Sequence, residues 1–200
     1  IIIMNPKHLQ IAYSALKPFL FGFIDPEYAH KVAIEQIKRI QEFTPPTYDS
    51  LSIDLFGYNF TSPILLAAGF DKYGSIVDYI PSFGFAGEVV GSISFKPSPG
   101  FQGKRLVRLP FRRGLLNKMG LNNDGAERTA ERLAGKGNYA LSITKTPDYS
   151  IQGDEAIEDY VRTFRLLKNL GFWAELDISC PNTQDGKTFQ DPNTLELLLN

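Results

Sequence analysis

The sequence has little of the material on which several classes of protein depend. It contains one cysteine, Cys180, which excludes an intrachain disulfide framework and a metal cluster built from cysteines. It has no run of about 18 apolar residues, the length that a membrane-spanning helix needs. Its 21 basic and 22 acidic side chains nearly cancel, so nothing indicates a nucleic-acid-binding surface. Neither metal nor nucleic acid is therefore expected as a partner, and 200 residues are enough for one globular domain.

What the sequence does have, from Pro63 onward, is a repeated alternation of apolar runs and amphipathic segments. The apolar runs predict strands at residues 64–68, 86–94, 139–143 and 173–178. The amphipathic segments predict helices at residues 75–83, 126–134, 154–170 and 192–199, with a long loop at 101–124. In the helix at 154–170, one face is predicted to carry Ile157, Val161, Phe164 and Leu167. Strands separated by crossovers predict an α/β fold with a parallel sheet and helices outside it.

Four such units are half of an eight-stranded (β/α)₈ barrel, which typically takes about 250 residues. The sequence stops at Asn200, inside a predicted helix. An open half would leave apolar strand edges at residues 64–66 and 176–178 without a neighbour. Three alternatives follow: the chain is a fragment, a partner closes the barrel, or the sheet is an open one.

The first 60 residues differ from this pattern. Residues 6–20 have helical spacing of apolar side chains, and Asp25-Pro26-Glu27 is typical of the start of a second helix, at 26–41. Two short helices in succession predict a helical hairpin. The phenylalanine-rich residues 19–23 between them either pack on the rest of the protein or form a surface for a membrane or an apolar ligand. Residues 51–60, around Gly57, predict a short β-hairpin.

The stretch 174–182, Ala-Glu-Leu-Asp-Ile-Ser-Cys-Pro-Asn, is the strongest candidate for a site. Its strand pattern ends at Pro181, so Cys180 lies where a strand gives way to a loop. In barrels of alternating strands and helices, that edge carries the chemistry. The thiol of Cys180, the carboxylate of Asp177 and the amide of Asn182 could supply a base and hydrogen bonds to a small polar ligand. The alternative is a buried structural cysteine at a strand end.

Other polar and small residues follow the ends of the remaining strands. Gly69 and Gly91 would let the backbone approach a flat ring closely. Lys72 and Lys145 would offset negative charge on a cofactor or an acidic substrate. Asn117 could present both a donor and an acceptor to a heterocycle. The carboxyl ends of parallel strands meet at one edge, so the sequence predicts that these side chains share a rim.

At this point the motifs resemble those of the dihydroorotate dehydrogenase family. The residues that carry the resemblance are Leu-Ala-Ala-Gly-Phe-Asp-Lys (66–72), Gly-Ser-Ile-Ser-Phe-Lys-Pro-Ser-Pro-Gly (91–100), Arg-Leu-Val-Arg-Leu (105–109), Asn-Lys-Met-Gly-Leu-Asn-Asn (117–123) and Ser-Cys-Pro-Asn-Thr (179–183). Residues 25–30 resemble the start of the quinone-using branch. The resemblance implies a (β/α)₈ TIM barrel that binds FMN and oxidises dihydroorotate to orotate in pyrimidine biosynthesis. Residues 1–45 would form a quinone-associated helical hairpin, and residues 46–200 the first half of the barrel.

The resemblance also implies roles for individual residues. Cys180 would be the catalytic base, in the position where the family has serine in the quinone branch and cysteine in the soluble branch. The implied FMN-binding residues are Ala67, Ala68, Gly69, Lys72, Ser92, Ser142, Lys145 and Asp177. The implied substrate-binding residues are Lys72, Asn117, Met119, Gly120, Leu121, Asp177 and Asn182. The residues expected near the quinone are His30, Arg105 and Arg108.

By the same resemblance, the partners would be dihydroorotate or orotate, a quinone, and a missing C-terminal half or a partner chain that closes the barrel. The protein would associate peripherally with a membrane, on the cytoplasmic side of a bacterial inner membrane or at the inner mitochondrial membrane.

The sequence departs from the family pattern at several points. Asp177 and Ser142 stand where the family usually has asparagines, and a soluble-branch cysteine is joined to a quinone-branch N-terminus. The family's later flavin-binding lysine and phosphate-binding glycine loops would lie beyond Asn200. A carboxylate accepts hydrogen bonds without donating them and repels an acidic substrate. Two alternatives are therefore kept: a related barrel acting on another dihydropyrimidine or an enone, and a truncated, non-catalytic binding module.

Overall fold

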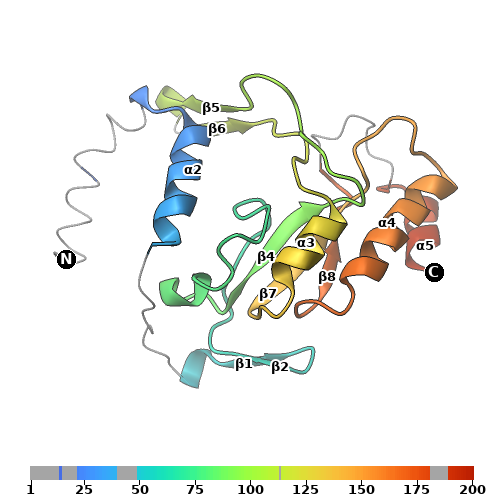
Figure 1. The fold of residues 1–200 in the computed structure, drawn as a ribbon, viewed down its shortest axis with the longest axis horizontal. Helices are drawn as coiled ribbons and strands as arrows, with labels where there is room; N and C mark the ends of the chain where they lie inside the picture. The colour runs from blue at the N-terminus through green and yellow to red at the C-terminus, as the bar shows by residue number, and fades with distance from the viewer. Residues whose placement is uncertain (1–13, 15–21, 40–48, 113, 181–188) are drawn as a thin grey trace.

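The computed structural model describes residues 14, 22–39, 49–112, 114–180 and 189–200. Its centre is a four-stranded parallel sheet in the order β3–β4–β7–β8, formed by Leu65–Leu66, Gly87–Ile93, Tyr139–Ile143 and Ala174–Leu176. Helices α3 (Ala126–Leu133) and α4 (Asp154–Leu167) cover one face of this sheet (Figure 1). The predicted α/β class, with parallel strands joined by crossovers, is confirmed.

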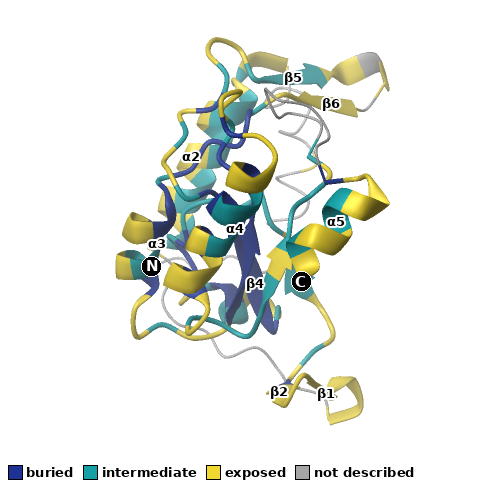
Figure 2. Cartoon of the chain, turned by 90° about the vertical axis from the view of Figure 1, so that its right-hand side faces the viewer, coloured by how far each residue is buried: buried dark blue, intermediate teal, exposed yellow. Residues whose placement is uncertain are grey.

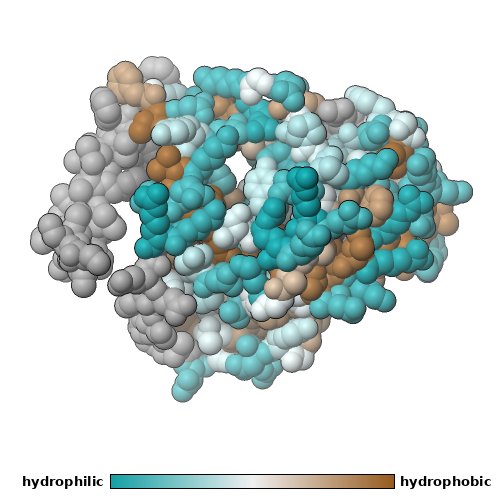
Figure 3. Space-filling view, viewed as in Figure 1, coloured by the Kyte–Doolittle hydropathy of each residue, from teal (hydrophilic) through white to brown (hydrophobic). Residues whose placement is uncertain are grey.

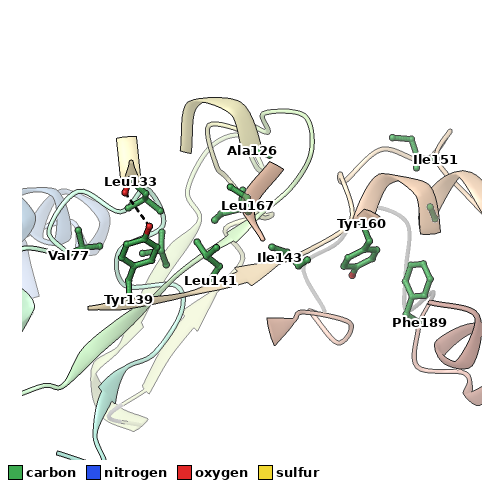
Figure 4. Close-up of a cluster of buried hydrophobic side chains, with 13 residues drawn as sticks. Val77, Ala126, Leu133, Tyr139, Leu141, Ile143, Ile151, Tyr160, Leu167 and Phe189 are labelled. Carbon is green, nitrogen blue, oxygen red and sulfur yellow. Dashed lines mark hydrogen bonds between the residues drawn. The ribbon is translucent and has the colours of Figure 1, made fainter. Parts of the chain in front are cut away.

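The two central strands, β4 and β7, are the most buried part of the molecule (Figure 2). Val90 pairs with Leu141, and both belong to one apolar cluster with residues of α3 and α4. Figure 4 shows Leu141 of this cluster beside Leu167 of α4. Because successive side chains point to opposite faces of a sheet, Ser142 points away from the helices. A strand buried on both faces explains why these runs are apolar without alternation.

Helix α4 buries a face that overlaps only in part with the predicted one. Its buried positions are Ala156, Asp159, Tyr160, Thr163 and Leu167, whereas Phe164 is 46% exposed. The polar members of this face are satisfied internally. The Asp159 carboxylate accepts from the Thr146 amide at 2.7 Å and from its hydroxyl at 2.9 Å, and the Thr163 hydroxyl donates to the Asp159 carbonyl oxygen. Of the predicted face, Leu167 is buried and Ile157 packs against the same core, whereas the prediction was wrong for Phe164. It missed Asp159 and Thr163 because it counted only apolar residues.

Two further predictions of local structure were wrong. Residues 75–79 form turns, followed by a 3₁₀ helix at Ile80–Phe83, instead of one α-helix. The Ile76 amide donates to the Asp71 carboxylate at 2.7 Å, which competes with a helical bond, and Pro81 lacks a backbone N–H. The predicted loop 101–124 contains an antiparallel hairpin, β5 (Leu106–Leu109) with β6 (Gly114–Asn117), joined through a 3₁₀ turn at Pro110–Arg112. All of β6 is exposed, so no buried face produced a recognisable pattern.

At the opposite end of the sheet, β1 (Ile53–Leu55) and β2 (Tyr58–Phe60) form the predicted antiparallel hairpin. Most of it is exposed and projects from the molecule (Figure 2). Phe60 is the exception, because its ring packs edge-on against Phe172 at 4.8 Å and Trp173 at 5.9 Å. These aromatic contacts attach the hairpin to the segment that leads into β8.

The N-terminal region contributes helix α2 (Pro26–Ile37), which begins as predicted. The Asp25 side chain accepts from the amides of Glu27 and Tyr28 at 2.9 and 3.0 Å, which caps the helix. The first helix of the predicted hairpin lies outside the described residues, so the hairpin and the 1–45 domain stay predictions. Helix α5 (Pro192–Leu199), capped by Asp191, completes the described chain.

Candidate functional site

The carboxyl ends of the parallel strands border a cavity of about 210 Å³. Its wall is formed by Ala68, Gly69, Lys72, Ser92, Asn117, Met119, Gly120, Leu121, Ser142, Glu175, Asp177 and Cys180. Eleven of these twelve residues were proposed from the sequence. The alternative of a cysteine sealed in the core does not describe Cys180, which is partly exposed in the cavity wall.

Two hydrogen bonds cross the cavity wall, one between β7 and β4 and one between β4 and the residue that follows β8. The Ser92 hydroxyl donates to the Asp177 carboxylate at 2.7 Å and lies 3.0 Å from the Ser142 hydroxyl. A hydroxyl has one proton, and that of Ser92 goes to Asp177, so Ser142 donates to Ser92. Serine at position 142 and aspartate at position 177, the two departures from the family pattern, therefore compensate each other: the carboxylate accepts and the hydroxyls donate.

The backbone at Asp177 is held by groups that sequence reasoning did not identify. Its carbonyl oxygen accepts from the Tyr160 hydroxyl at 2.8 Å and from the Thr144 hydroxyl at 3.3 Å. Its amide donates to the Ile143 carbonyl oxygen at 2.8 Å. Burial raises the pKa of Tyr160 to about 12, which keeps the phenol as a donor. These bonds fix the strand end three residues before Cys180.

Lys72 reaches the cavity from the loop that follows β3. Burial lowers the pKa of its ammonium, and the positive charge of Arg105 acts in the same direction. The charges of Cys180 and Asp177 act in the opposite direction, since both favour the protonated ammonium. Lys72 is the basic side chain of the site and is electrostatically coupled to both the sulfur and the carboxylate.

The far side of the cavity is the segment after β6. The Asn117 side-chain oxygen accepts from the Met119 amide at 3.1 Å and so shapes the turn. Gly120 has φ of +75°, and a side chain there would collide with the backbone and ring of Phe101. Glycine is therefore required at this position for the turn to close over the cavity.

Two of the predicted residues that the structure describes are not brought into this cavity. Ala67 does not line it. The Lys145 ammonium is buried and donates to the carbonyl oxygens of Thr146, Asp148 and Ile151 at 2.9–3.1 Å, where it holds the turn after β7. Asn182 lies outside the described residues. Glu175 is the wall residue that the sequence reasoning missed, although strand alternation places it on the same side as Asp177.

A second, larger cavity of about 1,110 Å³ adjoins the first, and most of its wall is apolar. The two cavities share Ala68, Gly69, Lys72, Asn117 and Met119 as a common wall. The larger cavity lies between α2, the β5–β6 hairpin and the loop at 68–72, where Figure 3 shows a gap in the surface.

Two of the three residues predicted near a quinone, His30 and Arg108, line the larger cavity. Nε2 of His30 lies 2.7 Å from the Phe70 carbonyl oxygen, and Arg108 donates to the carbonyl oxygen of Ile24. Arg105 lies outside the larger cavity and forms an ion pair with Glu27 of α2. Arg105 and Arg108 therefore connect the β5–β6 hairpin and the residues just before it to the N-terminal segment that contains α2.

A parallel α/β sheet with a basic side chain, a thiol, a carboxylate and an amide at the carboxyl edge of its strands defines a class of protein that binds a small polar ligand there. The family model for dihydroorotate dehydrogenase matches residues 50–200. The chain belongs to the dihydroorotate dehydrogenase family.

Curated relatives carry the same family name. A protein named dihydroorotate dehydrogenase (quinone) from Rhodopseudomonas palustris strain TIE-1 is 33% identical over 189 residues, which cover 94% of this chain and 52% of the relative. One with the same name from Nostoc punctiforme is 35% identical, covering 93% of this chain and 54% of the relative. The chain spans about half the length of the curated relatives it matches.

The fold agrees with solved structures over the same extent. The crystal structure of dihydroorotate dehydrogenase from Eimeria tenella in complex with ferulenol superposes with a TM-score of 0.78 at 25% identity. It covers 88% of this chain, and this chain covers 50% of it. The ligand-free structure from the same organism gives a TM-score of 0.76. The predicted half-barrel architecture is confirmed.

Proposed function

We propose that the protein oxidises dihydroorotate to orotate with FMN and passes the electrons to a quinone. The observation that carries this proposal is the meeting of Lys72, Asn117, Asp177 and Cys180 at one cavity, on the carboxyl edge of the sheet. Membership of the family and the printed names of the relatives support the reaction and the acceptor.

The residues of the smaller cavity fit the flat ring of FMN. A Cβ at Gly69 would meet only the Lys72 ammonium, at 3.9 Å, so the backbone there leaves room for a ring to approach. Ser92, Ser142 and Lys72 offer hydroxyl and ammonium groups that suit the polar edge of a heterocycle. When bound, FMN would supply the acceptor for the hydride that leaves C6 of dihydroorotate. In our proposal Ala68, Gly69, Lys72 and Ser92 hold it.

Cys180 takes the role of general base, removing the proton from C5 of dihydroorotate onto its sulfur. The thiolate is the reactive form, and the positive charge of Lys72 favours it. The negative charge of Asp177 opposes it, which the hydrogen bond from Ser92 partly offsets. Asn117 orients the pyrimidine through donor and acceptor bonds, and Lys72 attracts its carboxylate.

The larger cavity is proposed as the quinone site. Its apolar wall suits a lipophilic ring and tail, and His30 and Arg108 place polar groups within it. The wall that it shares with the smaller cavity brings the two ligands close to each other. Among the described residues, no helix is both long enough and apolar enough to cross a membrane. We propose peripheral attachment through residues 1–45, at a bacterial inner membrane or the inner mitochondrial membrane.

The test is anaerobic reduction of the purified protein. Addition of dihydroorotate should bleach the flavin absorbance, and a later addition of a soluble quinone should restore it with formation of orotate. A protein that carries FMN and is not bleached by dihydroorotate would contradict the proposed substrate. A protein that is bleached but is not reoxidised by quinone would contradict the proposed acceptor.

Asp177 favours a second candidate, a related barrel that acts on another dihydropyrimidine or an enone. Its carboxylate in the cavity wall would repel an acidic substrate. In this case Asp177→Asn should create or strongly raise dihydroorotate turnover, with Glu175→Gln as a control that removes a neighbouring charge. Equal turnover by the wild type and Asp177→Asn would count against this candidate.

A further inference from the structure

Glu88 is a buried charged residue to which nothing above assigns a role. It lies in β4, beside Leu66 of β3 and Tyr139 of β7, and its exposed fraction is 0%. Strand alternation puts its side chain on the same face as Val90, where the turn at Gly74 and the acids Asp71 and Asp78 lie. The register shifts between Gly91 and Ile93, so the alternation does not extend to Ser92 of the cavity wall. The Glu88 side chain points away from the ligand cavity. An ionised carboxylate in such a place strongly destabilises the folded state unless a partner compensates its charge.

The groups around Glu88 do not provide that partner. Within the described part of the chain, neither of its carboxyl oxygens has a hydrogen-bond donor. The charged groups that act on it are Asp71 and Asp78 from the turns above, and Lys136 after α3, which is itself paired with Asp78. The Tyr139 hydroxyl on the neighbouring strand donates elsewhere, to a backbone carbonyl. Asp71 and Asp78 repel a negative charge on Glu88, and Lys136 is already paired with Asp78. An ionised Glu88 would therefore have no compensating partner among these groups.

Asp71, by contrast, is bound to its own loop as an acceptor. It is 2% exposed, and its two oxygens accept from the amides of Tyr73 at 3.2 Å and Ile76 at 2.7 Å. The Asp71 carbonyl oxygen also accepts from the Gly91 amide of β4 at 3.4 Å. Two adjacent buried carboxyl groups cannot both be ionised, and a single proton between them satisfies both. Since Asp71 is committed to accepting, the proton belongs on Glu88.

We propose that Glu88 is a positioning residue: it remains a neutral carboxylic acid whose O–H donates to Asp71 and so fixes the loop that carries Lys72 into the ligand cavity. Lys72 directly follows Asp71, so this bond connects the middle of the sheet to the basic side chain of the site. The inference rests on the burial of both carboxyl groups, on the lack of a donor to Glu88 among the described residues and on the interaction between Glu88 and Asp71. Only a consequence for turnover rests on the proposed function.

The pH dependence has a definite sign. Burial, with the charge and hydrogen bond of Asp71, raises the pKa of Glu88 from its ordinary value of 4.5 to about 8. Between these values the folded state holds a proton that the unfolded state has lost, so stability falls as pH rises. The stabilisation is complete below pH 4.5 and is lost as pH passes through about 8. Within this window the folding equilibrium constant should fall by up to about tenfold per pH unit.

The test compares the purified wild type with Glu88→Gln and with Glu131→Gln, which changes an exposed glutamate of α3. Denaturant unfolding is followed across the window, together with hydrogen exchange of the Tyr73 and Ile76 amides. Glu88→Gln keeps a donor to Asp71 and has no proton to lose. The free energy of unfolding of Glu88→Gln should therefore not fall as pH rises through the window. The protection of its Tyr73 and Ile76 amides, relative to their intrinsic exchange rates, should also stay constant. Glu131→Gln should lose stability with rising pH as the wild type does.

A second measurement needs no variant. Infrared spectra of the wild type at neutral pH should contain the C=O stretching band of a buried carboxylic acid, and this band should disappear as pH passes about 8. Wild-type spectra without such a band would overturn the proposal. So would a Glu88→Gln protein whose stability falls with pH in parallel with the wild type. Neither result depends on bound FMN, so neither would bear on the proposed reaction.

Discussion

The sheet–helix body (β3, β4, β7, β8, α3 and α4) and the rim region (α2 with the β5–β6 hairpin) are stabilised by different interactions. In the body, Val90, Leu141 and Leu167 are completely buried, and the side chains interlock in one cluster (Figure 4). In the rim region, α2 has no fully buried residue and all of β6 is exposed. Within the rim region, polar contacts such as the ion pair of Arg105 with Glu27 join α2 to the β5–β6 hairpin, and a large cavity lies beside them.

This difference indicates that the body positions the cavity residues and that the rim region gives a ligand access to them. A close-packed interior holds the strand ends, and with them the cavity residues, in fixed positions. A rim attached by a few polar contacts leaves space for a ligand to enter and can move at small cost. The predictions below test whether the two regions separate in this way.

The largest effect is expected at Cys180, where the body meets the cavity. Loss of a general base typically lowers turnover by about 100- to 10,000-fold, so Cys180→Ala should do so for flavin reduction by dihydroorotate. The unfolding midpoint should change little, because the side chain is partly exposed. Stopped-flow reduction and denaturant unfolding measure the two quantities. Cys180→Ser is the matched control, since a hydroxyl keeps the size of the group and some basicity; reduction at the wild-type rate by Cys180→Ala would exclude the role as base.

The next largest effect concerns stability, and it is tested by making the same leucine-to-alanine change in each of the two regions. Leu141→Ala in β7 should lower the free energy of unfolding by about 2–5 kcal/mol, because it empties a fully buried site. Leu116→Ala in β6, where the side chain is 59% exposed, should change it by less than about 0.5 kcal/mol. Equal losses in the two variants, measured by chemical denaturation, would mean that the rim region is packed as tightly as the body.

A smaller effect is expected from the contact that joins α2 to the hairpin. Arg105→Leu breaks the ion pair with Glu27, a partly buried pair worth on the order of 1 kcal/mol. The KM for quinone should rise several-fold, because the wall of the larger cavity is loosened, while flavin reduction by dihydroorotate stays within about twofold. Glu35→Gln, which breaks an exposed pair with Lys38 on the same helix, is the control. An unchanged quinone KM would mean that this contact does not shape the acceptor site.

The smallest effect concerns acid. The hydrogen bond from Arg105 lowers the pKa of Glu27 below its ordinary value of 4.5, so the ionised pair stabilises the folded state at neutral pH. This contribution is present above pH 4.5 and is lost as pH falls through the lowered pKa. Glu27→Gln should therefore reduce the stability difference between neutral and acidic solution. An acid unfolding profile identical to that of the wild type would show that the pair contributes no measurable stability.

Much of the fold was predictable because burial leaves a pattern. The runs around β4 and β7 are mostly apolar, and β7 and α5 were predicted with the bounds that the structure shows. The cavity residues at the ends of the parallel strands were predictable for a topological reason, since these strands deliver their carboxyl ends to one edge. Met119, Gly120 and Leu121 follow β6 instead and were proposed only from the resemblance to the family. Lys145 shows the limit of that reasoning. It follows β7 as expected, yet its ammonium turns back to three carbonyl oxygens of its own loop.

The sequence by itself determined the order of the four parallel strands and of helices α3, α4 and α5, and the residue types at each strand end, because these depend on local pattern and chain connectivity. Only the tertiary structure decided which polar groups meet. The Ser92–Asp177 bond, the Tyr160 hydroxyl on the Asp177 carbonyl oxygen and the burial of Glu88 beside Asp71 all join residues that are distant in the chain. The energies of these contacts depend on the distances between the groups and on the exclusion of water. Both are set only when the sheet and helices have packed together.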